Sequence, residues 1–176
     1  PSEAKESVVA RMLNLLIEAK TKGIELVVFP ELCLTTFFPR YYITDPANLD
    51  TYYESEVPIS LMSDMFELVR KEKIIISFGY AERDNGIPFN TSVYVDSSGN
   101  IVGKYRKIHL PGHYEYEPDR PFQHLEKRYF TKGNLGFPTF DTTLGRLGMC
   151  ICNDRRWPET YRVLALQGCD VVTLGY

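Results

Sequence analysis

The feature that most constrains the fold of this chain is an alternation of amphipathic helical segments with short apolar segments. Residues 2–22 repeat apolar side chains at the spacing of one buried helix face. Residues 24–29 follow as a continuous apolar run around one glutamate, bounded by a glycine and a proline, which is typical of a strand buried on both faces. The alternation returns with a helix over residues 58–73 and a strand over residues 74–80.

The second half of the chain continues this mixed pattern. Further strands are predicted over residues 90–95, 101–106, 137–140, 146–152 and 170–174, and a helix over residues 157–168. Turn-forming residues between the first two of these strands indicate a hairpin. Residues 31–57 and 107–136 lack periodicity, and segments this long in a compact domain are usually functional. Helices that cover a mixed sheet predict an α/β fold, and we expect a single, partial domain over residues 1–176.

Composition limits the possible partners and cofactors. The net charge of -3 argues against a nucleic-acid partner, because phosphate binding needs a basic face. Without a secretory signal or a membrane-length apolar run, we expect a cytoplasmic protein with no membrane partner. Disulfides are then not expected among the four cysteines. Cys150 and Cys152 lack the two-residue gap of a zinc ligand pair, so no metal is expected either.

Chemistry is expected at the carboxyl ends of strands, where open α/β sheets bind ligands. Glu31 follows the strand at residues 24–29, and burial there would raise its pKa and make it a better base near neutral pH. The alternative interpretation is a solvated or capping glutamate. Lys107 ends the strand at residues 101–106, on the same face as Tyr105, where it could stabilise a developing negative charge. The alternative is a surface lysine.

Cys152 is the candidate nucleophile. It lies where a strand breaks into a turn and then a helix, and the helix N-terminus is expected to favour a thiolate. Backbone N–H groups at that turn could hold an oxyanion. Cys33, Cys150 and Cys169 are interpreted as small buried residues.

Three motifs together resemble the nitrilase, or carbon–nitrogen hydrolase, superfamily. They are FPE at residues 29–31, YRKIHL at residues 105–110 and CNDR at residues 152–155. The resemblance implies a catalytic triad of Glu31, Lys107 and Cys152. It also implies an α-β-β-α sandwich, in which two sheets lie between outer helices.

A narrower resemblance is to N-carbamoyl-D-amino acid amidohydrolases. It rests on LTTFFPR at residues 34–40, HLPG at 109–112, PFQHLEKRYF at 121–130 and CNDRRWPET at 152–160. It implies hydrolysis of an N-carbamoyl-D-amino acid to the amino acid, carbon dioxide and ammonia, without a cofactor. The chain is then expected to lack the first strand and the C-terminal part, to be inactive and poorly soluble in isolation, and to form a homo-oligomer when full length.

The resemblance also suggests roles around the triad. Glu126 matches a second glutamate that positions Lys107 or the substrate. Arg155 and Arg156 are expected to bind the substrate carboxylate, because guanidinium groups bind carboxylates in bidentate fashion. The alternative is that one of these arginines pairs structurally with Asp154 or Glu159.

Three further residues are expected near the substrate, namely Asn153, His109 and His124. Either histidine could instead be a packed hydrogen-bonding residue. Two other functions remain open for the same scaffold. One is an aliphatic amidase, nitrilase or β-ureidopropionase, and the other is a truncated chain without activity.

Overall fold

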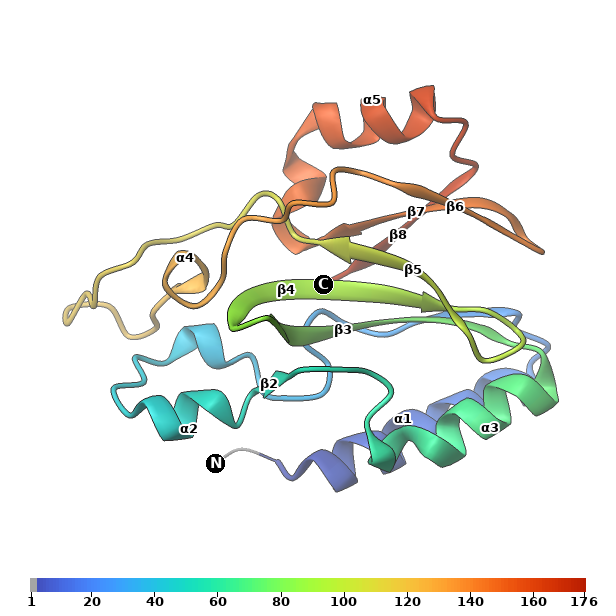
Figure 1. The fold of residues 1–176 in the computed structure, drawn as a ribbon, viewed down its shortest axis with the longest axis horizontal. Helices are drawn as coiled ribbons and strands as arrows, with labels where there is room; N and C mark the ends of the chain where they lie inside the picture. Colours follow the sequence, from blue (N-terminus) through green and yellow to red (C-terminus); the bar gives the residue numbers. More distant parts are fainter. Residues whose placement is uncertain (1–2) are drawn as a thin grey trace.

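The computed structural model describes residues 3–176. Its helices and strands alternate along the chain as the sequence predicts (Figure 1). The α-helices are α1 (Lys5–Thr21), α2 (Pro46–Asp50), α3 (Ser63–Glu72), α4 (Glu126–Tyr129) and α5 (Pro158–Leu166). The strands are β1 (Leu26–Val28), β2 (Tyr53–Glu54), β3 (Ile75–Asp84), β4 (Ile87–Val95), β5 (Ile101–Arg106), β6 (Thr139–Thr142), β7 (Gly145–Ile151) and β8 (Val171–Gly175). Three 3-10 helices are η1 (Phe38–Arg40), η2 (Ser60–Met62) and η3 (Cys152–Arg156).

The first sheet has the strand order β1-β3-β4-β5, with β2 also paired to β3. β1 and β2 run parallel to β3, whereas β3, β4 and β5 form antiparallel pairs. β3 turns into β4 through Asn85 and Gly86, which have φ angles of 49° and 83°. Two positive φ angles at an Asn-Gly pair match the two-residue turn that suits the twist of a hairpin. The predicted hairpin between β4 and β5 is confirmed.

The second sheet has the order β6-β7-β8 and packs against the first. Buried side chains from both sheets fill the interface, among them Tyr94 and Tyr105 from the first sheet and Leu147 and Met149 from the second. The Tyr94 hydroxyl donates to the carbonyl oxygen of Gly148 across this interface at 2.9 Å. The two sheets therefore share one core, and this hydrogen bond satisfies the hydroxyl group of a tyrosine that is buried in it.

Helices cover the outer face of each sheet. α1 and α3 bury Leu16 and Val69 against the first sheet, in a cluster that includes Ile76 and Phe78 of β3. α5 packs over β7, where a side chain at Gly148 would collide with Leu164. Figure 1 shows the resulting four layers, with α5 at the top and α1 and α3 at the bottom. The predicted α-β-β-α arrangement is confirmed.

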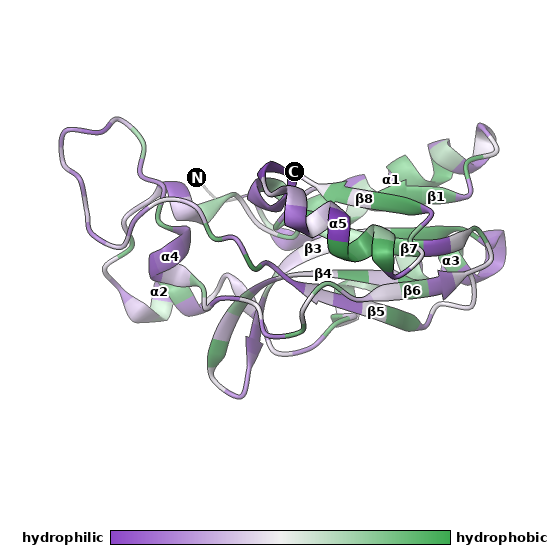
Figure 2. Cartoon of the chain, turned by 90° about the horizontal axis from the view of Figure 1, so that it is seen from above, coloured by the Kyte–Doolittle hydropathy of each residue, from purple (hydrophilic) through white to green (hydrophobic). Residues whose placement is uncertain are grey.

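The hydropathy of the chain follows these layers. Figure 2 shows hydrophobic residues concentrated in the strands and in parts of α1 and α5. The long loop before α4 is mostly hydrophilic in the same view. The core thus lies between the two sheets and between the first sheet and helices α1 and α3. The loops that surround the strand ends are polar.

Three predictions need correction. The strand at residues 24–29 is not buried on both faces, because β1 lies at the edge of its sheet and Val28 is 38% exposed. The segment at residues 31–57 is not wholly irregular, since it forms η1, α2 and β2. Likewise, residues 107–136 contain the short helix α4. Those elements have few residues each, so the sequence has little room to show their periodicity.

Candidate active site

Glu31 is placed by a turn that leaves β1 and crosses β3. Gly79 of β3 permits this crossing, because a Cβ atom there would lie only 2.8 Å from the backbone nitrogen of Leu32. The N–H group of Cys33 donates to the Gly79 carbonyl at 2.9 Å and fixes the turn against the strand. The Glu31 side chain is consequently almost fully buried, as predicted.

Lys107 follows β5 directly and is fully buried. Lys104 and Arg106 both bind Glu82 on one face of β5, so Tyr105 and Lys107 take the opposite face. This confirms the predicted alternation and excludes a surface position for the lysine.

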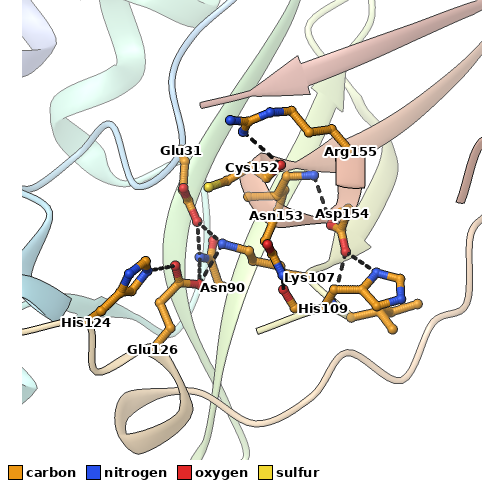
Figure 3. Close-up of polar contacts among 12 residues, drawn as sticks. Glu31, Asn90, Lys107, His109, His124, Glu126, Cys152, Asn153, Asp154 and Arg155 are labelled. Carbon is orange, nitrogen blue, oxygen red and sulfur yellow. Dashed lines mark hydrogen bonds and ion pairs between the residues drawn. The ribbon is translucent and has the colours of Figure 1, made fainter. Parts of the chain in front are cut away.

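The Lys107 ammonium is held between two carboxylates. Its Nζ atom donates to Oε1 of Glu31 and to Oε2 of Glu126, each at 2.6 Å (Figure 3). Glu126 begins α4 and is also fully buried. Its other oxygen lies 3.4 Å from Nε2 of His124. The structure thus brings together the two glutamates and the lysine that the sequence singled out.

Cys152 occupies a strained turn immediately after β7. Its φ angle is 44°, a left-handed conformation that costs a non-glycine residue about 1–3 kcal/mol. The side chain lines the same cavity as Glu31. Strain of this kind persists only where the surroundings fix the backbone.

Asp154 is the residue that fixes this turn. Its buried carboxylate accepts hydrogen bonds from the Ile151 N–H group at 3.0 Å and from the Tyr105 hydroxyl at 2.8 Å. It also accepts from the His109 N–H group at 3.0 Å, and Nδ1 of the His109 ring lies 2.8 Å away. One carboxylate therefore connects the turn of Cys152 to the strand that carries Lys107.

The surroundings shift the pKa values of the three central groups. Burial raises the pKa of Glu31, and the positive charge of Lys107 only partly opposes this effect. Burial alone would lower the pKa of Lys107, but the charges of Glu31 and Glu126 outweigh it and the net pKa is raised. Lys107 is accordingly a cation at neutral pH.

The thiol of Cys152 does not follow the sequence prediction. Burial raises its pKa, the positive charge of Lys107 lowers it, and the charges of Glu31 and Glu126 raise it further. The net pKa is above the ordinary value, so the expected thiolate is wrong for the free protein. A thiol with a raised pKa needs a base to remove its proton, and Glu31 lies in the same cavity.

A cavity of about 680 Å³ opens above this cluster. Glu31, Cys152 and four of the residues expected near the substrate line it, namely His124, Asn153, Arg155 and Arg156. Its other lining residues are Phe37, Arg40, Pro111, Arg120, Phe122, Gln123 and Tyr176. Four arginines and one carboxylate therefore line the space. Arg120 is paired with Glu117, and the positive charge that the other three contribute favours an anionic ligand.

The two arginines after Asp154 are available to such a ligand. Nη1 of Arg155 donates to the Cys152 carbonyl oxygen at 3.0 Å, and its guanidinium lies 4.1 Å from the centre of the Tyr176 ring. Within residues 3–176, neither Arg155 nor Arg156 has an ion pair with a carboxylate. Asp154 instead binds His109, so the alternative in which it pairs with an arginine is not observed.

His109 is placed differently from the prediction. Its ring stacks on Trp157, with centroids 4.8 Å apart, and is held by Asp154. It is not among the residues that line the cavity. Asn153 does line the cavity, and its Nδ2 atom donates to the His109 carbonyl oxygen at 2.9 Å. His109 thus supports the turn from behind, as the packed-histidine alternative proposed.

Two residues in this cluster were missed from the sequence. Asn90, in the middle of β4, donates to Oε1 of Glu31 at 2.6 Å. Asp154 was considered only as a partner for an arginine. The run of three polar residues at positions 90–92, inside β4, is the one signal that could have drawn attention to Asn90.

No grouping of three or more His, Cys, Asp or Glu residues within residues 3–176 is arranged to hold a metal ion. Over the same residues, no helix is both long and apolar enough to cross a membrane.

Comparison with known proteins identifies the family. The profile described as Carbon-nitrogen hydrolase matches residues 1–176. The chain therefore belongs to the carbon–nitrogen hydrolase family, whose members include amidases and nitrilases that act on carbon–nitrogen bonds. This confirms the broader of the two resemblances.

Individual relatives differ in their named substrates. The chain is 30% identical over 168 residues to citrullinase of Francisella tularensis, covering 93% of this chain and 53% of the relative. It is 36% identical over 161 residues to a nitrilase of Pyrococcus abyssi, covering 90% and 54%. It is 29% identical over 167 residues to N-carbamoylputrescine amidase of Arabidopsis thaliana, covering 93% and 51%. The chain thus spans about half the length of these curated relatives.

Solved structures agree on the fold. The crystal structure of a carbon-nitrogen hydrolase from Helicobacter pylori G27 matches with a TM-score of 0.81 and 30% sequence identity. The match covers 98% of this chain and 55% of that chain.

Proposed function

We propose that this chain carries the catalytic residues of a cysteine-dependent amidohydrolase that acts on N-carbamoyl-D-amino acids. One observation carries the proposal. A single cavity is lined by Cys152 and Glu31 and also by Arg155 and Arg156, and neither arginine has an ion pair with a carboxylate within residues 3–176. Such a cavity suits a substrate with a reactive carbonyl at one end and a carboxylate at the other.

The first half of the reaction forms a covalent intermediate. Glu31 removes the proton of the Cys152 thiol, which its raised pKa otherwise retains. The sulfur then attacks the ureido carbonyl carbon, and the carbonyl oxygen becomes negatively charged. The Lys107 ammonium and a backbone N–H group after Cys152 stabilise that charge. The carbon–nitrogen bond breaks as Glu31 returns its proton to the leaving nitrogen.

The second half releases the product. Glu31 removes a proton from water, which attacks the acyl group on Cys152. The tetrahedral intermediate collapses, the carbon–sulfur bond breaks, and Glu31 gives its proton to the sulfur. The N-carboxy amino acid that is released then loses carbon dioxide to leave the free amino acid. The buried charge of Glu126 holds Lys107 in place through both halves, at a distance of 2.6 Å.

Recognition of the carboxylate is assigned to the arginines. The Arg155 guanidinium is oriented by the Cys152 carbonyl and by the Tyr176 ring. Arg155 lies one turn from the nucleophile. A substrate whose carboxylate binds its guanidinium would therefore have its reacting carbon held at a set position relative to the Cys152 sulfur. The preference for the D-isomer rests on the resemblance of the sequence motifs alone.

The comparisons support a second candidate, another amidase or nitrilase of the same family. The chain is more similar in sequence to the Pyrococcus abyssi nitrilase than to the other two relatives described. Two relatives, however, are named for ureido compounds, citrullinase and N-carbamoylputrescine amidase. The ureido group is thus common to them and to the proposed substrate.

Substrate comparison tests the proposal. Ammonia release by the intact protein is measured with N-carbamoyl-D-phenylalanine, its L-isomer, N-carbamoyl-β-alanine, an aliphatic amide, a nitrile and 2-phenylethylurea. The last compound keeps the ureido group and the ring but lacks the carboxylate. We expect turnover of the D-isomer and little turnover of 2-phenylethylurea.

Arginine variants provide the matched control. Arg155→Ala is expected to raise KM for N-carbamoyl-D-phenylalanine by about tenfold or more, because a charge-assisted hydrogen bond is lost. Arg162→Ala removes an exposed arginine on α5, outside the cavity, and should leave KM unchanged. Unchanged affinity in both Arg155→Ala and Arg156→Ala, or faster turnover of the amide or nitrile, would refute this substrate assignment.

A further inference from the structure

Asn90 contacts all three charged residues beneath the cavity. It is almost fully buried in β4. Its Nδ2 atom donates to Oε1 of Glu31 at 2.6 Å and lies 3.5 Å from Oε2 of Glu126. Its backbone carbonyl accepts from the N–H group of Lys107 at 2.8 Å. Figure 3 shows the amide beside Lys107, between the two carboxylates.

The orientation of this amide is set by the two carboxylates. A carboxylate only accepts hydrogen bonds, so the NH₂ group and not the amide oxygen must face Glu31 and Glu126. The amide oxygen of Asn90 is buried and has no hydrogen-bond partner within residues 3–176. A buried acceptor without a partner is unfavourable, so it needs an explanation. The explanation is that the NH₂ group of the same amide donates charge-assisted hydrogen bonds to the carboxylates, which hold the amide in this orientation.

The two oxygens of Glu31 are thereby made different. Oε1 accepts from Asn90 and from Lys107, both at 2.6 Å. Both of these hydrogen bonds use the same oxygen, and the Cys152 thiol is a further hydrogen-bond partner of the Glu31 side chain. The second oxygen is therefore the one available to a proton from the cavity that Glu31 shares with Cys152.

We propose that Asn90 is a positioning residue that fixes the Glu31 carboxylate through one oxygen and keeps it ionised, so that the other oxygen can take the Cys152 proton. The groups that face Glu31 are Lys107 at the end of β5, Glu126 of α4, Cys152 of η3 and Asn90 itself. Asn90 is a neutral donor that keeps its protons, unlike the Cys152 thiol, and its hydrogen bond favours the ionised carboxylate against the effect of burial.

The test measures the ionisation of Glu31 directly. The side-chain carboxyl carbons of glutamate are titrated by ¹³C NMR in the intact protein, and the Glu31 resonance is assigned by its absence in Glu31→Gln. We expect Asn90→Ala to raise the titration midpoint of Glu31 by about one pH unit. Asn90→Leu keeps a similar volume without a donor and should do the same, which retains a test should the alanine variant fail to fold.

Ser92→Ala is the matched control. Ser92 is also buried, two residues further along the same face of β4, and its hydroxyl contacts Ser77 and the Phe78 carbonyl instead of the carboxylates. We expect no shift of the Glu31 midpoint in this variant. A Glu31 midpoint that stays at the wild-type pH in the Asn90 variants, with only a lower thermal stability, would overturn the inference and leave Asn90 a structural residue.

The role of Asn90 in catalysis rests on the proposed function, and kinetics separate the two. The acid limb of kcat/KM should move by the same amount as the NMR midpoint. If the NMR midpoint moves but no N-carbamoyl amino acid is hydrolysed by the wild type, the positioning of Glu31 stands and the substrate assignment fails. If the wild type turns over and the midpoint does not move, the positioning inference fails alone.

Discussion

Replacing Lys107 by methionine removes the cation between two buried carboxylates while keeping most of the side-chain volume. Lys107 and Glu126 are fully buried and Glu31 is nearly so, and both ion pairs are 2.6 Å long. Removing one partner of a buried ion pair typically costs about 3–5 kcal/mol, because the remaining charge stays out of water. We expect a loss of that size in the free energy of unfolding at pH 7.5.

The pH dependence of this loss has a definite sign. Without Lys107, the folded-state pKa of Glu31, already raised by burial, rises further above its unfolded value of about 4.3. The folded protein then binds a proton more tightly than the unfolded chain does. The loss of unfolding free energy in Lys107→Met is therefore largest above the raised pKa of Glu31, and it shrinks as the pH falls through that pKa towards about 4.3.

Urea unfolding of the wild type and Lys107→Met at pH 7.5 and pH 5 measures both effects. The control is Lys104→Met, which removes a partly exposed lysine from Glu82 while Arg106 remains bound there. That change should cost less than about 1 kcal/mol. A similar small loss for Lys107→Met, or a loss of equal size at both pH values, would refute the account of a charge cluster held together by Lys107.

Two further predictions concern the turn of the nucleophile. Asp154→Asn replaces one acceptor oxygen by a donor, which then faces either the His109 N–H group or the Ile151 N–H and Tyr105 O–H groups. We therefore expect a loss of about 3 kcal/mol in urea unfolding, and no measurable loss would contradict the role of Asp154. Alkylation of Cys152 by iodoacetamide should be slow at pH 7 and rise with an apparent pKa above the ordinary thiol value, because burial raises the thiol pKa. A fast, pH-independent reaction between pH 6 and pH 8 would instead indicate a preformed thiolate.

The sequence could predict residues whose position depends on local chain geometry. Glu31 and Cys152 follow strands that end abruptly, and Lys107 is placed by simple alternation along β5. These features are local, so periodicity and turn signals reveal them. The Asn-Gly pair that joins β3 to β4 is an equally local signal, of a two-residue turn.

The features that the sequence did not reveal depend on contacts between distant parts of the chain. Asn90 and Glu31 are 59 residues apart in sequence, and they become partners only when β4 pairs with its neighbouring strands. His109 lies outside the cavity because Asp154, 45 residues further on, holds its ring. The exposure of Val28 follows from the edge position of β1, which the composition of the strand does not encode.

The central claim is that the Cys152 sulfur forms a covalent bond with the substrate. Mass spectrometry of the intact protein, quenched with acid during turnover of N-carbamoyl-D-phenylalanine and then digested, tests this claim most directly. We expect an acyl adduct on the peptide that contains Cys152, and neither adduct nor ammonia release in Cys152→Ala. An adduct on another residue, or ammonia release that persists in Cys152→Ala, would contradict it.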